Sequence, residues 1–233
     1  MKSRTLLACA ALGLVLCARA AAAQEAAPPA QPQLTFNIGA VSDYRFRGVS
    51  QTMDDPAIQG GADLSYGALY AGTWASNVDF GGPTHAEVDL YGGVRPTFAG
   101  FNLDIGAIAY LYPGQASGTH ENYVEARFAA SRAIGPATLG AAVYWSPEFF
   151  GKSGDAVYYE ANAAWKLSDR WSVSGAVGRQ DVSYAGDYTT WNAGVSFQAT
   201  PRIALDLRYV DTDGHAFGDV YGSTAVASIK ASF

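Results

Sequence analysis

Residues 34–65 alternate apolar and polar side chains, as two β-strands joined by a polar loop would. In the first half, bulky even positions are apolar from Leu34 onward, whereas the odd positions include Asp43, Arg45 and Arg47. Because a strand points successive side chains to opposite faces, one face is apolar and the other carries two arginines and an aspartate. Such a polar face cannot be a dry core. A soluble sandwich would also fit one strand of this kind, so the choice depends on the whole chain.

The same alternation recurs along the chain and predicts twelve strands of about ten residues each, with no helical window of comparable quality. The connections after the even-numbered strands are short turns. Those after the odd-numbered strands are mostly longer, glycine-rich and acidic. This segregation predicts an all-β fold, an up-and-down, antiparallel transmembrane β-barrel with its apolar face outward and a polar interior. A soluble sandwich has no reason to separate its loops in this way.

The N-terminus has the pattern of a signal peptide. Lys2 and Arg4 precede an apolar run over 6–16, and residues 21–23 supply an A-x-A cleavage site. The run is shorter than the ~18 residues of a spanning helix. The following segment contains three prolines and is predicted to be disordered. The predicted divisions are a signal peptide over 1–23, a disordered lead-in over 24–33 and the outer-membrane barrel over 34–233.

Cleavage would change both the charge and the cysteine content. It removes three basic residues and no acidic ones, which takes the formal net charge from −6 to −9. An acidic chain is a poor partner for nucleic acid. Cys9 and Cys17 leave with the signal peptide, so the mature chain has no disulfide, thiolate metal site or cysteine nucleophile.

The chain ends as a strand with an aromatic last residue, Phe233. This ending resembles the assembly signal of outer-membrane barrels. It predicts secretion across the inner membrane of a Gram-negative bacterium and insertion into the outer membrane by the barrel-assembly machinery. Outer-membrane lipid and lipopolysaccharide are the other expected partners.

The charges on the inward parity are the candidate functional residues. Buried charges must be wet or paired. One interpretation is a water-filled constriction, in which arginines face carboxylates and the protein is a porin-like channel for passive diffusion of small hydrophilic solutes or ions. The alternative is a closed structural or adhesive barrel, filled by ion pairs, whose loops bind surface partners. Barrels of about eight strands are filled by side chains and barrels of about sixteen strands leave a channel. A twelve-stranded barrel lies between them, so its size does not decide whether the lumen is open. The predicted pore-lining residues are Asp43, Arg45, Arg47, Asp63, Glu87, Asp89, Asp104, Glu125, Arg127, Glu160, Asp206 and Arg208, and Lys230 shares their parity.

Arg45 and Arg47 fall on one face of the predicted first strand, about 7 Å apart. Such a pair can grip an anionic group. More often such a pair of arginines forms ion pairs with neighbouring carboxylates, and Glu87 and Asp89 are the candidate partners. The excess of acidic side chains over basic ones on this parity favours cations weakly.

No catalytic or metal-binding pattern stands out. The stretch from Asp211 to His215 has the density of a calcium loop but lacks the spacing and final Glu of an EF-hand. His85, His120 and His215 are scattered in or beside long loops, and Gly-x-Ser-x-Gly does not occur. The chain is therefore predicted to be no enzyme and to hold no cofactor and no metal. Aromatic residues near strand ends are predicted to form interface belts: Trp145, Trp165, Trp171 and Tyr209.

The segment VSDYRFRGVSQTMDDPAIQGGADLS, followed by YAGTWASNVDF and EVDLYGG, is similar to the TorF-type porin family, formerly grouped as conserved hypothetical proteins of proteobacteria. Later matches lie at 110–113, 158–160 and 230–233. The resemblance implies an outer-membrane β-barrel with pore activity. It carries over no catalytic residue and names no solute.

Overall fold

The computed structural model describes residues 31–233. The predicted signal peptide and residues 24–30 of the predicted lead-in lie outside the described residues. The first strand begins at Gln33, one residue before the predicted start of the barrel.

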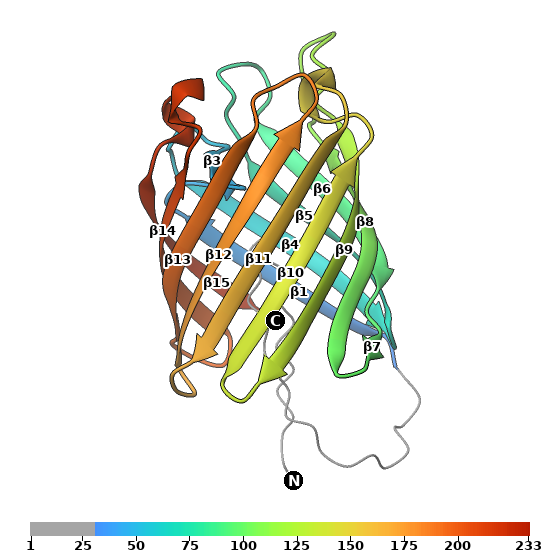
Figure 1. The fold of residues 1–233 in the computed structure, drawn as a ribbon, viewed down its shortest axis with the longest axis vertical. Coiled ribbons are helices and arrows are strands. Elements are labelled where there is room, and N and C mark those ends of the chain that lie inside the picture. The colour runs from blue at the N-terminus through green and yellow to red at the C-terminus, as the bar shows by residue number, and fades with distance from the viewer. Residues whose placement is uncertain (1–30) are drawn as a thin grey trace.

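Twelve antiparallel strands form a closed barrel, as predicted (Figure 1). Each strand pairs with its neighbours in the sequence, and the ring closes where β1 pairs with β15. The short strand β7 extends one edge of β8 and does not cross the barrel. The bounds are β1 (Gln33–Val41), β4 (Ala57–Tyr66), β5 (Leu69–Asn77), β6 (Ala86–Val94), β7 (Thr97–Phe98), β8 (Phe101–Leu111), β9 (Tyr123–Ile134), β10 (Ala137–Ser146), β11 (Ala156–Lys166), β12 (Trp171–Val182), β13 (Tyr188–Gln198), β14 (Ile203–Thr212) and β15 (Thr224–Ser232).

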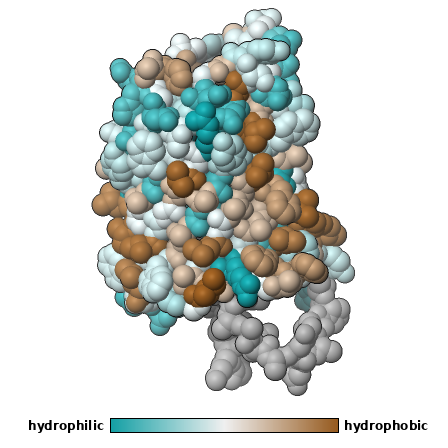
Figure 2. All heavy atoms as spheres, in the orientation of Figure 1, coloured by the Kyte–Doolittle hydropathy of each residue, from teal (hydrophilic) through white to brown (hydrophobic). Residues whose placement is uncertain are grey.

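The alternation in the sequence is an alternation of outward and inward side chains. Large apolar side chains such as Leu34, Ile58 and Val177 point outward and are exposed. In Figure 2, hydrophobic residues gather over the middle and lower parts of the visible face, and hydrophilic residues over its upper part. The predicted belt residues are also outward and exposed: Trp145, Trp165, Trp171 and Tyr209.

The two ends of the barrel differ in their connections. The short-turn end lies at the bottom of Figure 1 and the long-loop end at the top. Three short 3-10 helices lie in the long loops: η1 (Phe150–Lys152), η2 (His215–Phe217) and η3 (Asp219–Tyr221). Within residues 31–233, no helix has the length and apolar character needed to cross a membrane.

The main departure from the sequence prediction follows β1. The predicted first strand continued through Arg47, but the wall strand ends at Val41. Residues 42–56, called here the lumen hairpin, leave the wall and form the two-stranded pair β2 (Arg45–Phe46) and β3 (Val49–Ser50).

The turn of the lumen hairpin explains this departure. Arg47 and Gly48 have φ values of 50° and 89°, and two central residues with positive φ are the mark of a two-residue hairpin turn. The alternation continued past residue 41 because β2 is itself extended, although it belongs to the hairpin.

Candidate functional site

The tip of the lumen hairpin crosses the interior and reaches the wall opposite its own base. Arg47 donates through Nη1 and Nη2 to the two carboxylate oxygens of Glu125 on β9, at 2.9 and 2.6 Å. Nη1 also donates to Gln180 Oε1 on β12, at 2.8 Å. The guanidinium lies 4.9 Å from the ring centre of Tyr144 on β10 and 4.4 Å from that of Tyr158 on β11. Arg47 thus contacts four consecutive strands.

This ion pair is almost dry. The side chain of Arg47 is 6% exposed and that of Glu125 is 1% exposed. A two-point Arg–carboxylate contact between aromatic faces is among the stronger ways to hold a buried charge. Removing one partner of such a pair leaves an uncompensated charge in the interior. The contact therefore fixes the hairpin tip against the far wall.

The residues beside Arg47 extend the contact in both directions around the barrel. Phe46 packs edge-on against Tyr110 of β8, with ring centres 5.7 Å apart. Gly48 lies against Thr190 of β13 and Thr212 of β14, and a Cβ at this position would fall 2.6 Å from Thr212 Cγ2. The hairpin tip therefore meets every strand from β8 to β14.

Arg45 has a different set of partners from Arg47 and anchors the hairpin to a long loop. It forms ion pairs with Asp43 and Asp54. Its Nη1 also donates to the carbonyls of Val220 and Gly222, at 2.8 and 3.0 Å. The expectation that the two arginines share one face of a strand is therefore wrong. Neither arginine is paired with the predicted partners on β6.

An aromatic cluster fills the space between the hairpin base and β5, β6 and β8. Tyr44 packs edge-on against Trp74, and Tyr110 stacks on Tyr123 with ring centres 4.4 Å apart. Tyr112 is also buried here. Together with the hairpin, these rings fill much of the long-loop half of the barrel.

Glu87 and Asp89 lie on the inward face of β6, level with this cluster, because Asp89 is directly opposite Trp74 on β5 and Tyr110 on β8. Their exposed fractions are 1% and 0%. Tyr44 donates its hydroxyl to Glu87 Oε1 at 3.1 Å. Glu87 Oε2 and both carboxylate oxygens of Asp89 have no hydrogen-bond partner among the described residues.

The short-turn half is more open. Asp104 accepts from Tyr70 at 2.6 Å and pairs with Arg95 and Arg127, each at 3.0 Å. The side-chain exposures are 15% for Asp104, 18% for Arg127 and 48% for Arg95. These charges are paired but not dry.

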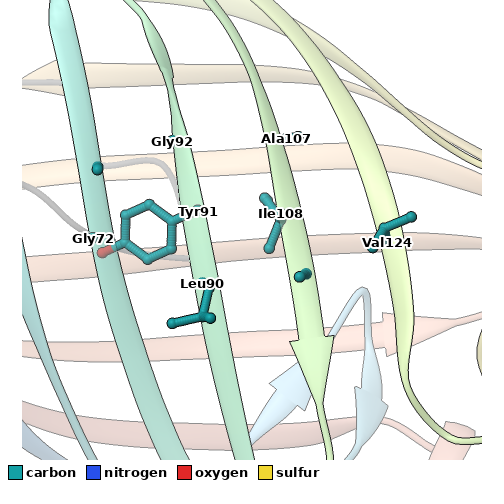
Figure 3. Close-up of a pocket in the computed structure, with 9 residues that line it drawn as sticks. Gly72, Leu90, Tyr91, Gly92, Ala107, Ile108 and Val124 are labelled. Carbon is teal, nitrogen blue, oxygen red and sulfur yellow. The ribbon is translucent and has the colours of Figure 1, made fainter.

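Glycines let tyrosine side chains lie against the inner wall of this half. Tyr91 of β6 lies over Gly72 of β5 (Figure 3). A Cβ on Gly72 would fall 2.5 Å from the Tyr91 ring. The Tyr91 hydroxyl donates to Asp63 at 2.6 Å. The missing side chain of Gly72 thus keeps a large ring out of the middle of the lumen.

The other wall of the short-turn half carries a second charged group. Arg208 pairs with Asp206 at 3.2 Å and donates to Asn192 at 2.6 Å and to Ser174 at 2.9 Å. Arg208 and Asp206 have side-chain exposures of 22% and 23%. Glu160 accepts hydrogen bonds from its neighbours Tyr158 and Asn162.

The predicted pore-lining residues thus separate into two groups, and their assignment as pore-lining stays a prediction. Those in the long-loop half are Asp43, Arg45, Arg47, Glu87, Asp89 and Glu125, and those in the short-turn half are Asp63, Asp104, Arg127, Glu160, Asp206 and Arg208.

The sequence prediction missed the uncharged members of the site. Gln180, Tyr110, Tyr144 and Tyr158 surround the tip of the hairpin. Their inward parity was available from the alternation. What they contact depends on the hairpin, which the prediction had placed in the wall.

The loop histidines and acids do not converge in the described part of the chain. His215 Nε2 lies 2.7 Å from Asp211 Oδ1. Residues 31–233 contain no group of three or more His, Cys, Asp or Glu side chains arranged to hold a metal ion.

A closed twelve-stranded barrel with an apolar exterior and a polar interior defines the chain as a barrel of the outer-membrane porin fold. Residues 23–233 match the family described as "Bacterial protein of unknown function (Gcw_chp)", and the chain belongs to that family. No curated protein matches the chain.

Solved structures with the same fold are porins and channels of low sequence identity. The KdgM porin has a TM-score of 0.61 and 8% identity, with 85% of this chain and 99% of that chain covered. The NanC porin has a TM-score of 0.55 and 8% identity, with 86% of this chain and 98% of that chain covered. An outer membrane channel from Pseudomonas putida F1 has a TM-score of 0.51 and 10% identity, with 89% of this chain and 96% of that chain covered. These similarities show the fold.

Proposed function

We propose that this protein is an outer-membrane channel that passes small hydrophilic solutes or ions by passive diffusion through a narrow, charged lumen. The observation that carries the proposal is the state of the short-turn half, where paired charges such as Arg127, Asp104 and Arg208 keep 15–22% of their side-chain surface accessible. A barrel that served only as a scaffold would gain nothing from charges held at a wet inner surface. The porin fold supports the same proposal.

The lumen hairpin is the constriction of this channel. It occupies the long-loop half and is fastened on both sides, by Arg47 to Glu125 and by Arg45 to the carbonyls of Val220 and Gly222. Passage through the long-loop half therefore depends on the narrow space around the hairpin or on its displacement.

The proposed setting follows from the barrel and the earlier sequence features. The long loops face the cell exterior and its lipopolysaccharide, and the short turns face the periplasm. The signal peptide and the terminal Phe233 provide the route through secretion and barrel assembly. The resemblance to TorF-type porins agrees with this setting.

A second candidate function has its own support. Arg47, Glu125 and Gln180 are so deeply buried that the long-loop half resembles a filled core. This favours a closed structural or adhesive barrel whose loops bind surface partners.

Planar-bilayer recordings separate the two functions. The mature chain is compared with a variant in which residues 43–55 are replaced by a short Gly/Ser turn. A matched control replaces residues 116–119, which belong to another long connection. Discrete ion-conducting steps that become severalfold larger only in the hairpin variant support the channel and the role of the hairpin.

Silence from both the parent protein and the hairpin variant, in preparations that show the heat-modifiable mobility of a folded barrel, would contradict the channel and support the closed barrel. Equal conductance in all three proteins would retain the channel but contradict the constriction.

A further inference from the structure

Three carboxylate oxygens beside the base of the lumen hairpin have no hydrogen-bond partner among the described residues. They are Glu87 Oε2 and both oxygens of Asp89. The two residues are two positions apart on β6 and therefore share its inward face. Side chains two positions apart on one face of a strand are neighbours, so the two carboxylates can approach one shared ligand. Buried polar groups in folded proteins almost always have partners, so three orphaned oxygens in one place call for an explanation.

The positive charges nearby are already engaged. Arg47 is paired with Glu125, and Arg45 with Asp43 and Asp54. Arg127 pairs with Asp104 through Nη1 in the short-turn half, and its Nε has no hydrogen-bond partner within residues 31–233. The remaining groups packed around the two carboxylates are aromatic and uncharged, from the hairpin, β5 and β8: Tyr44, Trp74, Tyr110 and Tyr112. Two carboxylates are therefore buried with no cationic side chain paired to them in the described part of the chain, an arrangement that is unfavourable as long as both are ionised.

A shared proton would not satisfy all three oxygens. One proton bonded to one carboxylate makes a single hydrogen bond to the other, which accounts for two oxygens and leaves the third without a partner. A metal cation bound between Glu87 and Asp89 would contact all three at once and would supply the missing positive charge.

We propose that Glu87 and Asp89 form a binding site for a hard divalent cation, best matched by Ca²⁺, beside the base of the lumen hairpin. Ca²⁺ accepts carboxylates in one-point or two-point contact and tolerates irregular geometry, whereas Mg²⁺ requires a near-ideal octahedron and retains water. The two carboxylates together offer four oxygens, and the Tyr44 hydroxyl adjoins them. With only two carboxylates, the expected affinity is that of weak extracellular calcium modules, with Kd of about 10⁻⁴–10⁻³ M.

The site has a structural consequence for the hairpin. Glu87 and Asp89 belong to the wall, while Tyr44 belongs to the hairpin base. A cation held there would tie the base to β6, which is separated by β8 alone from β9, the strand that carries the Arg47 partner Glu125. This inference does not depend on conduction, because a closed barrel would bind the cation equally well.

Binding is tested on the full mature chain refolded in detergent micelles and treated with EDTA. The folded protein is titrated with CaCl₂ and, separately, with MgCl₂, and thermal unfolding is followed by heat-modifiable mobility. At a Ca²⁺ concentration a hundredfold above Kd, we expect the midpoint to rise by roughly 5–10 °C, with a smaller response to Mg²⁺. Equilibrium dialysis should show Ca²⁺ bound to the parent protein.

The variant Glu87→Gln/Asp89→Asn should lose both the midpoint shift and the bound Ca²⁺. The matched control Glu160→Gln/Asp206→Asn removes two lumen carboxylates from the short-turn half and should retain both. If the double variant on β6 does not fold, Asp89→Asn alone serves in its place and should weaken binding at least tenfold.

Two results would overturn the proposal. One is a parent protein that neither binds Ca²⁺ in dialysis nor gains thermal stability. The other is a calcium response that persists unchanged when Glu87 and Asp89 are replaced, which would place the ion in the acidic loops.

Discussion

The two halves of the lumen are built by the same twelve strands, yet they hold their charges in different ways. In the long-loop half, Arg47 and Glu125 are nearly inaccessible and their contact fastens a hairpin to the wall. In the short-turn half, Arg208 and Asp206 keep about a fifth of their side-chain surface exposed. The strands do not cause this difference. The lumen hairpin does, because it enters only one half.

The comparison shows that inward orientation and chemical role are separate properties. A charge facing a wet wall interacts weakly with its partner, because water screens both and competes for their hydrogen bonds. A charge covered by a hairpin must be paired, and its loss is costly. Residues of one type and one parity can therefore be structural in one half and exposed to water in the other.

The largest expected effect comes from breaking the dry ion pair. Glu125→Gln leaves Arg47 buried without a counter-charge, and we expect a loss of about 3–5 kcal/mol in the free energy of unfolding. The control Asp206→Asn breaks the wet pair and should cost about 1 kcal/mol or less. Denaturant unfolding of the refolded barrel measures both. Equal losses in the free energy of unfolding for the two variants would show that both halves of the lumen are equally solvated. The contrast between a dry half and a wet half would then be wrong.

A smaller loss is expected when the hairpin turn is changed. Gly48→Ala places a Cβ 2.6 Å from Thr212 Cγ2 at a φ of 89°, and we expect a cost of about 1–3 kcal/mol from backbone strain and the clash. Gly81→Ala is the control, because Gly81 also has positive φ but has open space around it. The difference between the two variants in thermal midpoint isolates the contact with the far wall.

If Gly48→Ala lowers the thermal midpoint no more than Gly81→Ala does, the hairpin tip does not press against β14. A conductance larger in Gly48→Ala than in the parent protein would indicate that the strained hairpin tip loses its contact with the far wall.

Removing a charge from the short-turn half should change the ion selectivity of the channel more than its stability. Arg208→Gln removes a positive charge from the short-turn half, and we expect a modest shift toward cations together with a stability loss of about 1 kcal/mol or less. The reversal potential in a KCl gradient measures the shift. Ser174→Ala removes one hydrogen-bond acceptor of Arg208 and keeps its charge, so selectivity should be unchanged. A shift toward anions in Arg208→Gln would contradict the assignment of this charge to the permeation path.

The barrel itself was predictable from the sequence because alternation is a local property. Leu34 and Ile58 point outward, as their parity indicates, and the strand count and the separation of loop lengths follow from the same pattern. A strand has only two faces, so parity alone decides which side chains are inside.

The lumen hairpin was not predictable in the same way. Residues 44–47 continue the alternation of β1, and nothing in the parity marks where the wall ends. The available signal was local: Gly48 supplies the positive φ that a two-residue turn needs. The partner of Arg47 was beyond reach, because Glu125 is 78 residues away in the sequence and meets Arg47 only across a closed ring.

The smallest expected effect lies outside both halves, in the turn after β11. The hydrogen bond from Lys166 and its positive charge lower the pKa of the fully exposed Asp169 carboxyl. A lowered pKa in the folded state gives a contribution to stability that is present above the unfolded-state pKa and is lost as pH falls through the folded-state pKa. Because solvent screens this pair, Lys166→Ala should return the Asp169 pKa to its ordinary value, measured by carboxyl NMR titration, without a measurable change in thermal midpoint. A clear fall in the midpoint would mean that an exposed pair contributes as a buried one does, and the contrast between dry and wet charges would then need another cause.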